Sequence, residues 1–475
     1  MARLPETVRW RDLSGGNVQK VSPDISIKNS VPFSMNLLYD LVLGEAVSRE
    51  GTDRLGSQFA AGTDCTGLFQ HLDTTHANSV LFTKFGTDIY DVIGNSSSIS
   101  SLTAANKARF TTFINSTLMC TGAENRSYTN AGWVSSGGVF DLANVPTGAQ
   151  FPIEFKDRVY VAVTDRFYYT ATPSGGTVSW TAAGSGSIQV EQEDGGGTIN
   201  GASKVPGYLM IYKQRSLKRW NFDSTFPEDL VNIGTQSHES ILRARGNNYF
   251  FYGPNGFYET NGGYPSRISR PIQRIIDAIP ASFYTEVNGW SDNENLYWSV
   301  GDLTIDFDRG YTEIHNNVVL RYNIDAQQWT PLKYAHEFRF MHQYIDASNN
   351  VLITGGDTEG QVLQLNTLNT DYDGQAITYI LQSPEIDFGF RDRKKTVFEK
   401  VIVHSDRTIG AELQVRLDYG DWKSIGSIKD IVTEVKIKPL NANVFEWRIV
   451  DSITGEQVKL KGMDWPAVSV QESSK

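Results

Sequence analysis

Short runs of apolar and aromatic residues, separated by polar turns, recur along most of this chain. VLFTKFGTDIYDV from Val80 and NYFFYGPNGFYET from Asn248 each have the pattern of two strands joined by a tight turn. Successive turn centres lie 39 to 50 residues apart, at Gly86, Asn125, Asp165, Arg215, Asn255, Asp302 and Asn349. A period of about 40–50 residues with several strands per unit is typical of a β-propeller blade. We therefore expect an all-β fold with a propeller of six or seven blades, some of them irregular, over residues 68–368.

The sequence on either side of these repeats predicts two further parts. Residues 1–67 show little helical periodicity and form an N-terminal segment whose strands, including one around Leu37–Leu43, are expected to pair outside the repeats. After Asn369, short segments of alternating character follow one another, and in one of them Leu413, Val415 and Leu417 share a face. Regular short strands of this kind predict a small antiparallel β-sandwich over residues 369–475.

One segment of the repeat region has helical periodicity instead. Four isoleucines spaced at i, i+3, i+4 and i+7 give it an apolar face: Ile272, Ile275, Ile276 and Ile279. Ser269 is placed to cap this helix, Pro271 fits its first turn and Pro280 closes it. We expect the apolar face to pack on the outside of a sheet, with a partner-binding role as the alternative. Ser96–Ser101 and Gly184–Gly201 are expected to be exposed loops.

Composition supports an ordered protein. Charged residues make up 20% of the chain, hydrophobic residues 40% and aromatic residues 12%. A formal net charge of −11 argues against general nucleic-acid binding, because attraction to phosphate needs a basic surface. Cys65 and Cys120 are expected to be free buried thiols, with a disulfide between them as the alternative. The N-terminal residues lack the apolar region of a secretory signal, and no run approaches the ~18 apolar residues that span a bilayer, so no membrane insertion is expected.

The sequence contains no recognisable catalytic motif. There is no G-x-S-x-G, H-E-x-x-H, Walker loop or C-x-x-C. His71 and His76, with Asp73 between them, are two histidines five residues apart without a third ligand nearby, which favours ordinary surface or hydrogen-bonded residues over a metal site. A stretch rich in carboxylates could suggest glycoside hydrolysis, but alternation along a strand beside a turn is the simpler interpretation; its acids are Asp292, Glu294, Asp302, Asp306 and Asp308. No catalytic residue is assigned.

The loop NTDYDGQ is the best candidate for a metal site. Asn369, Asp371, Asp373 and Gly374 match the first half of a calcium loop, in which oxygens at alternate positions converge on the ion. The twelfth position is Ile380, so the bidentate glutamate of such loops is missing. Because Asn, Asp and Gly are also what a turn needs, a plain turn between domains is favoured. We expect no cofactor.

Several segments resemble the tail nozzle, or tail stabilisation, proteins of short-tailed bacteriophages. GNNYFFYGPNGFYETNGGYPSRISRPIQRIID is followed by NLYWSVG, VVLRYNIDAQQWTPL and LQSPEIDFG, and then by the predicted sandwich. Two short patterns contribute most to the resemblance. They comprise Arg49, Gly51 and Thr52 near the start, and Tyr322, Asn323, Gln328 and Trp329 in a later hairpin. The resemblance covers most of the chain, although none of these motifs carries chemistry.

The resemblance implies a structural virion protein assembled in the host cytoplasm. Copies would form a ring, with a hexamer expected, at the neck or tail around the DNA exit channel. Such a ring would retain and guide double-stranded DNA during ejection and would dock an adaptor, fibres or other tail proteins. An acidic surface would suit DNA passage, because like charge opposes adhesion.

A basic run interrupts the acidic C-terminal region. Arg391, Arg393, Lys394, Lys395 and Lys400 could form a solvated turn, a subunit contact or a DNA contact. The solvated turn is the simplest interpretation, and DNA binding is opposed by the charge of the rest of the chain. Within a ring, we expect the first four of these residues to meet acidic residues on the adjacent copy or on a neighbouring protein.

Two other classes of function compete with the virion interpretation. A carbohydrate-binding or glycan-cleaving propeller would use a central pocket, and sialidase-type propellers carry S-x-D-x-G-x-x-W motifs. Ser291–Trp298 (SDNENLYW) lacks the glycine of that motif. A monomeric scaffold propeller is the third class, and the sequence does not separate it from a ring subunit.

Overall fold

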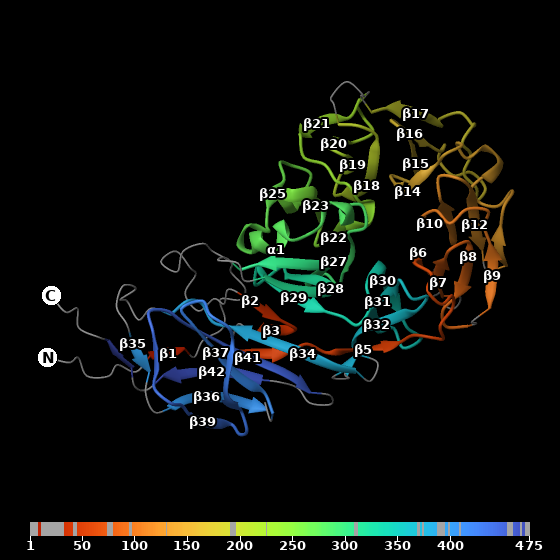
Figure 1. Ribbon diagram of the computed structural model, residues 1–475. Helices are drawn as coiled ribbons and strands as arrows, with labels where there is room; N and C mark the ends of the chain where they lie inside the picture. Colours follow the sequence, from red (N-terminus) through yellow and green to blue (C-terminus); the bar gives the residue numbers. More distant parts are fainter. Residues whose placement is uncertain are drawn as a thin grey trace.

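The structure is a computed structural model of the 475-residue chain. It describes residues 8–10, 33–40, 45–73, 79–94, 97–129, 131–190, 196–224, 226–307, 312–367, 371–372, 375–386, 395–397, 400–407, 410–453, 459–465 and 468–470. Almost all regular structure in these residues is β-strand (Figure 1), which confirms the prediction of an all-β chain. In the described part, no helix has the length and apolar character needed to cross a membrane.

Six separate antiparallel sheets of four strands follow one another along the described chain. In each, the strands pair in the order in which they occur in the sequence. The first three contain β6 (Cys65–His71), β7 (Val80–Phe85), β8 (Asp88–Asp91) and β9 (Ser98–Ser101); β10 (Arg109–Phe113), β11 (Ser116–Cys120), β12 (Asn125–Thr129) and β13 (Gly132–Val134); and β14 (Gln150–Phe155), β15 (Arg158–Val163), β16 (Arg166–Tyr169) and β17 (Gly186–Gln189).

The next three sheets continue this arrangement. They contain β18 (Ile199–Val205), β19 (Tyr208–Lys213), β20 (Leu217–Trp220) and β21 (Glu228–Val231); β22 (Leu242–Ala244), β23 (Asn247–Tyr252), β24 (Gly256–Thr260) and β25 (Ser266–Arg267); and β26 (Asn288–Ser291), β27 (Asn295–Asp306), β28 (Thr312–Asn323) and β29 (Gln328–Lys333). Short 3-10 turns lie between some of these strands, at η2 (Leu142–Asn144), η3 (His238–Ser240), η4 (Gly253–Asn255) and η6 (Ala281–Phe283).

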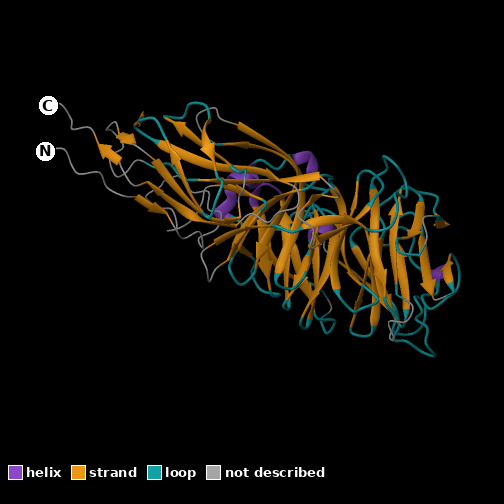
Figure 2. Cartoon of the chain, turned by 90° about the horizontal axis from the view of Figure 1, so that it is seen from below, coloured by secondary structure: helices purple, strands orange, loops and turns teal. Residues whose placement is uncertain are grey.

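A seventh group of four strands combines the two ends of the repeat region. β30 (Phe338–Ile345), β31 (Val351–Asp357) and β32 (Val362–Thr367) pair in order, and β5 (Gly51–Arg54) then pairs antiparallel with β32. The seven groups lie around a common axis (Figure 1), and a second view shows their strands standing side by side (Figure 2). The prediction that the whole N-terminal segment pairs outside the repeats is therefore wrong for β5. This strand precedes the first group in sequence but pairs with the last strand of the seventh group.

Packing between neighbouring sheets explains why they form a ring. Alternate side chains of one strand point to opposite faces: Tyr249 and Phe251 of β23 belong to the core shared with the β26–β29 sheet, whereas Phe250 belongs to the core shared with the β18–β21 sheet. The β30–β32 group and the β6–β9 sheet also share a core, through Phe340 and Leu81. Each sheet is too small to bury both of its faces alone, so stacking on two neighbours supplies its stability. The result is a propeller-like all-β architecture.

The hairpin spacing predicted most of the turns correctly. Gly86, Asp165, Arg215 and Asn255 lie between the second and third strands of their sheets, and Asn349 lies between β30 and β31. Two assignments differ from the structure. Asn125 is the first residue of β12, because the hairpin turns at 121–124, and Asp302 lies inside β27, a strand of 12 residues. The charged residues of β27 resemble those of a turn, although they lie within one strand of a long hairpin.

The predicted isoleucine-rich helix is shorter than its periodicity suggested. A 3-10 turn, η5 (Arg270–Ile272), leads into α1 (Gln273–Asp277), and all four isoleucines are buried in the core between the β22–β25 and β26–β29 sheets. Ser269 does not cap the helix through its side chain; its Oγ accepts a hydrogen bond from the Phe257 amide at 3.0 Å. The helix thus fills the space between two sheets.

Both predicted exposed loops contain strands. Ser98–Ser101 is β9, an edge strand whose small side chains leave it largely exposed, and Gly186–Gln189 is β17. Edge strands present one free side and one pleated face to solvent, so their sequences resemble loops.

The C-terminal part consists of two sheets over a common core, and the first of them continues the sheet of β30, β31, β32 and β5. Strands β33 (Asp371–Tyr372), β34 (Gln375–Gln382), β41 (Phe445–Ile453), β37 (Glu412–Leu417) and β38 (Lys423–Ser427) form one, with β2 (Phe33–Met35) on β34. The other contains β3 (Leu37–Asp40), β4 (Glu45–Ser48), β42 (Lys459–Trp465), β36 (Lys400–Arg407) and β39 (Val432–Lys436), with β1 (Val8–Trp10) on β42. A small sheet of β40 (Leu440–Ala442), β35 (Lys395–Val397) and β43 (Val468–Val470) adjoins them.

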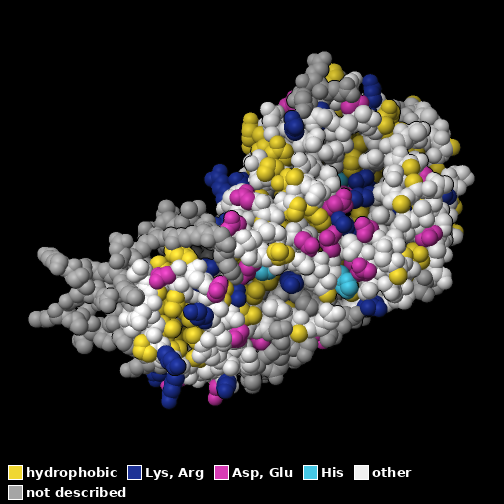
Figure 3. All heavy atoms as spheres, in the orientation of Figure 1, with side chains coloured by type: hydrophobic (Ala, Val, Ile, Leu, Met, Phe, Trp, Pro, Cys, Tyr) yellow, Lys and Arg dark blue, Asp and Glu magenta, His cyan; other side chains and the backbone are white. Residues whose placement is uncertain are grey.

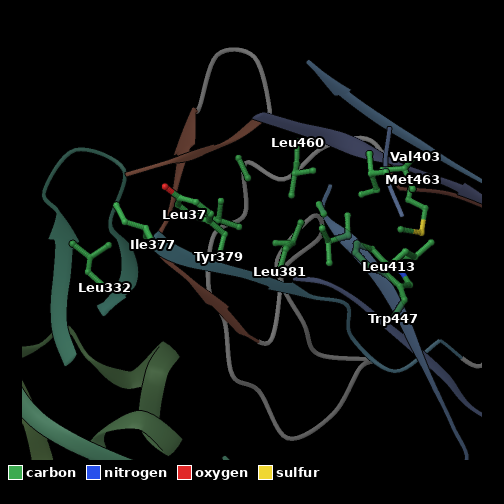
Figure 4. Close-up of a cluster of buried hydrophobic side chains, with 14 of the residues drawn as sticks. Leu37, Leu332, Ile377, Tyr379, Leu381, Val403, Leu413, Trp447, Leu460 and Met463 are labelled. Atoms are coloured by element: carbon green, nitrogen blue, oxygen red, sulfur yellow. The ribbon is translucent and has the colours of Figure 1, made fainter. Parts of the chain in front are cut away.

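Apolar side chains from both sheets meet in this core (Figure 4). Leu381, Leu413 and Trp447 come from the first sheet, and Val403 and Met463 come from the second. The alternation of Leu413 and Val415 with polar residues in β37 is the pattern that antiparallel strands with one buried face require. The N-terminal strands β1 to β4 thus belong to the C-terminal part, although more than 300 residues separate them in sequence.

Candidate functional site: the cavity on the axis of the ring

The first strands of all seven groups surround a cavity of about 340 Å³ on the axis of the ring. Its walls include residues of β6, β10, β14, β18, β22, β26 and β30. Consecutive residues of these strands line it, such as Arg109, Phe110 and Thr111 of β10, because the inner edge of each sheet, and not one of its faces, lies toward the axis. Residues from all seven groups, between Leu68 and His342, therefore supply its lining.

Charged residues concentrate on one side of the cavity. The Lys204 ammonium pairs with Glu154, and the Arg109 Nε lies 2.9 Å from Glu239 Oε1. Arg243 in β22 also lines the cavity and is exposed, and in the described part of the chain its guanidinium has no hydrogen-bond or ion-pair partner. Three cations thus face two carboxylates, which leaves a local excess of positive charge in a chain whose net charge is −11. Figure 3 shows basic and acidic side chains close together near the centre of the ring.

The opposite side of the cavity is aromatic. The rings of Phe69 and Phe110 stack with their centroids 5.1 Å apart, and Phe69 lies 5.0 Å from the His342 ring. Trp290, which is half-buried, packs on the other side of His342 at 4.5 Å. Burial lowers the pKa of His342 to about 3, so at neutral pH the imidazole is uncharged and this wall carries no charge of its own.

A second cavity of about 490 Å³ adjoins the first and shares Arg109, His238 and Glu239 with it. The cations Arg109 and Lys107 hold the pKa of the Glu239 carboxyl well below its usual range despite its burial. Burial lowers the pKa of His238 to about 4, and the neighbouring cations contribute to this shift. The junction of the two cavities is therefore a carboxylate held by cations beside a neutral histidine.

The described residues of the sequence-based metal candidates have structural roles. Asp371 lies in β33, and Ile380 lies in β34 opposite Met35 and Val450; Asn369 and Asp373 are outside the described residues. His71 is fully buried with its Nδ1 2.9 Å from Thr117 Oγ1, and His76 is outside the described residues. Across the ranges that the structure describes, no three His, Cys, Asp or Glu residues are grouped to hold a metal ion.

The carboxylate-rich stretch is dispersed over one long hairpin. Asp292 accepts the amides of Glu294 and Asn295 at 2.9 and 2.6 Å and so stabilises the turn before β27. Asp302 accepts the Asn317 amide at 2.9 Å across the hairpin, and Asp306 is exposed at the strand end. Asp308 lies outside the described residues. None of the described acids of this stretch lines the axis cavity.

Neither the cysteines nor the basic-run residue whose side chain the structure describes, Lys400, lines the cavity. Arg391, Arg393 and Lys394 fall outside the described residues, and of Lys395 only the backbone, paired in β35, is described. The Lys400 Nζ lies 2.6 Å from Glu434 Oε1 in the same sheet. Cys65 and Cys120 are free and buried, as predicted, and burial raises the pKa of both thiols, so both remain protonated.

The residues that shape the cavity were missed at the level of sequence. Arg109, Lys204, Glu239, Arg243 and Trp290 belong to no motif, and nothing in their spacing brings them together. Arg109, Lys204, Arg243 and Trp290 lie in the first strands of their sheets, and Glu239 lies in η3 just before β22. Position within the repeat was therefore the available signal.

Comparisons with known proteins support no assignment of family. No protein-family model matches the chain, and no curated protein matches it. Two solved structures of an extracellular domain from B. thetaiotaomicron, described as a hybrid two-component system and as a one-component system, have TM-scores of 0.43 and 0.44 at 11% identity. They match 67% and 93% of this chain, which covers 40% and 63% of theirs.

A third solved structure, of BBS1N in complex with ARL6DN, has a TM-score of 0.40 at 8% identity and matches 68% of this chain and 97% of its own. All three scores are below 0.5, so none of these similarities bears on what the chain does.

Proposed function

We propose that this chain is a structural subunit of a bacteriophage neck or tail, and that its copies form a closed ring around the DNA exit channel. Its seven groups of strands would be the blades of a seven-bladed propeller, and its C-terminal sheets a β-sandwich. The sequence resemblance to nozzle proteins motivates this function. The structure contributes a physical reason why such a chain could bear load.

The main supporting observation is a sheet of ten strands that runs from one part of the chain into the other. Its path is β30-β31-β32-β5-β33-β34-β41-β37-β38, so the last group of the ring and the C-terminal part belong to one sheet. The two parts join at β33, a strand of two residues that pairs with β5 through Tyr372 and Thr52 and with the start of β34. A flexible linker would let the two parts rotate independently, whereas a continuous sheet can bend but resists rotation and separation. A ring that holds DNA under pressure needs subunits of this kind.

Two further contacts connect the same parts. The long β27–β28 hairpin reaches the C-terminal sheets, where Glu313 Oε1 lies 2.8 Å from Arg448 Nη1. On the same hairpin, the His315 ring stacks on Phe33 of β2 with centroids 5.1 Å apart. The hairpin therefore forms a second connection between the ring and the C-terminal part.

The axis cavity of a single chain is the size of a small-ligand pocket and does not admit a DNA duplex. The proposed DNA path therefore runs between copies, on the axis of the oligomer. The net charge of −11 suits that position, since an acidic lining would oppose adhesion of DNA as it passes.

Mass spectrometry of particles purified from cells that carry this gene tests the proposal. The chain is expected among the particle proteins in several copies, and the assembly that contains it is expected to survive purification as a multiple of 52.9 kDa. Absence of the chain from intact particles, together with a strictly monomeric mass in solution, would contradict the proposal.

A further inference from the structure

The axis cavity has two unlike walls, and this difference indicates the chemistry of a ligand. The charged side comes from β14, β18, η3 and β22 together with Arg109 of β10, and the aromatic side comes from β26, β30 and β6 together with Phe110 of β10. A cavity of about 340 Å³ lies within the range of pockets that hold small molecules. A molecule placed there would meet an aromatic surface at one end and cations at the other.

The three cations are not equivalent. Arg109 and Lys204 are each neutralised by a carboxylate, at Glu239 and Glu154. Arg243 faces the same space, and no described residue pairs with its guanidinium. A guanidinium whose donors are unused is suited to hold a carboxylate or phosphate through two parallel hydrogen bonds. A ligand that pairs with Arg243 would therefore need a negatively charged group.

The neighbouring wall provides an apolar surface. β26 follows β22 around the ring and the two strands are in contact, so Trp290 and Arg243 come from adjacent first strands. Trp290 is half-buried beside the neutral His342. A flat ring lying on Trp290 could carry an acidic group toward Arg243 without displacing either ion pair.

We propose that the axis cavity binds a small amphipathic anion, in which a planar apolar ring packs against Trp290 and a carboxylate or phosphate pairs with Arg243. This binding site is independent of the proposed structural function. It would give the chain a second role in its own interior, separate from its contacts with other subunits.

Isothermal titration with four probes tests the site: phenyl phosphate, benzoate, benzyl alcohol and inorganic phosphate. Both ring-bearing anions are expected to bind more tightly than the neutral ring or the bare anion. The tighter of phenyl phosphate and benzoate identifies the acidic group. Failure of both to bind at millimolar concentration, or equal binding of inorganic phosphate and phenyl phosphate, would overturn the proposal.

Substitutions distinguish anion binding in the cavity from anion binding to exposed arginines elsewhere on the chain. Arg243→Gln is expected to weaken the better ring-bearing anion about tenfold, the effect of losing a charge-assisted pair. Arg215→Gln is the matched control, because Arg215 is exposed in the β19–β20 turn and lies outside the cavity. Arg243→Lys keeps the charge but loses the paired donors, so intermediate binding is expected. Unchanged affinity in Arg243→Gln with an unchanged unfolding midpoint would also overturn the proposal.

Discussion

Arg49 holds three parts of the chain together through one side chain. Its Nε donates to Asn36 Oδ1 at 3.0 Å, its Nη2 donates to the Lys333 carbonyl at 3.0 Å, and its guanidinium lies 4.1 Å from the centre of the Tyr334 ring. The side chain is almost fully buried. The short pattern of Arg49, Gly51 and Thr52 that contributed to the sequence resemblance thus has a structural explanation.

Arg49→Met is expected to lower the free energy of unfolding by about 2–4 kcal/mol, because the Lys333 and Glu50 carbonyls would lose the hydrogen bonds that this side chain donates. Urea denaturation followed by tryptophan fluorescence measures the change. Arg215→Gln, a surface substitution of the same residue type, should stay within about 0.5 kcal/mol of the unchanged protein. Equal midpoints for the two variants would remove Arg49 from this role.

Acid is expected to destabilise the ring through its buried histidines. The pKa of His342 falls from 6.5 to about 3 in the folded chain, and that of His238 falls to about 4. Between those values and 6.5 the unfolded chain binds more protons, so stability falls as the pH is lowered through this window. His238 faces Glu239, Arg109 and Lys107, and the two cations add to the cost of a further positive charge.

The measurement is the unfolding midpoint at pH 7 and pH 5 for the unchanged chain and for His342→Phe, which keeps an aromatic ring between Phe69 and Trp290. The variant is expected to lose less stability on acidification than the unchanged chain. An identical loss in both would show that His342 does not contribute to the pH dependence.

Individual residues were predictable from sequence only where their local context was sufficient. The free buried thiols of Cys65 and Cys120 followed from composition. The positions of Arg243 and Glu239 in the axis cavity could not be predicted. They depend on which strands lie innermost in the ring and on which other strands surround the same space. Asp302 was misplaced since an exposed charged residue within a long strand resembles a turn residue.

At the scale of elements, β5 is the strand that connects the ring to the C-terminal part. It pairs with β32 on one side, and Thr52 also pairs with Tyr372 of β33 on the other, so one short strand connects the ring to the C-terminal part. Thr52→Pro is expected to lower stability by about 2–3 kcal/mol, because proline cannot donate to the ladder of a central strand. Ser136→Pro, in an exposed bend, is the control. Limited proteolysis should cleave the Thr52 variant faster, and equal rates would contradict the role of β5.

A double-mutant cycle tests the contact between the β27–β28 hairpin and the C-terminal part. Glu313→Gln and Arg448→Gln each remove one side of the 2.8 Å ion pair, whose side chains are 12% and 17% exposed. A coupling energy of about 1 kcal/mol is expected, since the pair is partly shielded from solvent. Denaturation of the two single variants and the double variant gives this value. Full additivity would mean that the pair does not link the two parts.

Elements with strong local patterns were predicted best. Tight hairpins such as β7–β8 and β23–β24 follow from their apolar runs and turn residues. The pairing of β5 with β32 was not predictable, because it joins residues about 310 positions apart without any local signal. The isoleucine stripe correctly identified a buried helical face, but it overestimated the length of α1 since the final isoleucine is in the turn that follows.

At the scale of the whole molecule, one sheet and the β27–β28 hairpin connect the ring to the C-terminal part, and assembly of copies should depend on their surfaces. Reversal of Arg393 and Lys394 to Glu is expected to impair assembly into particles while the isolated subunit still folds, because charge pairs between copies set register. Reversal of Lys436 and Lys438, exposed in and after β39, is the control of equal charge. Complementation by plasmid-borne variants, scored by particle yield and DNA retention, compares them. Normal particles from the first variant would exclude the basic run from the interface.

Electron cryomicroscopy of purified particles tests the central claim most directly. We expect the density to show several copies of this chain in a closed ring around the DNA channel, each with the ten-stranded sheet unbroken between its two parts. A particle in which the chain occupies no ring, or in which the two parts take different relative positions from copy to copy, would contradict it.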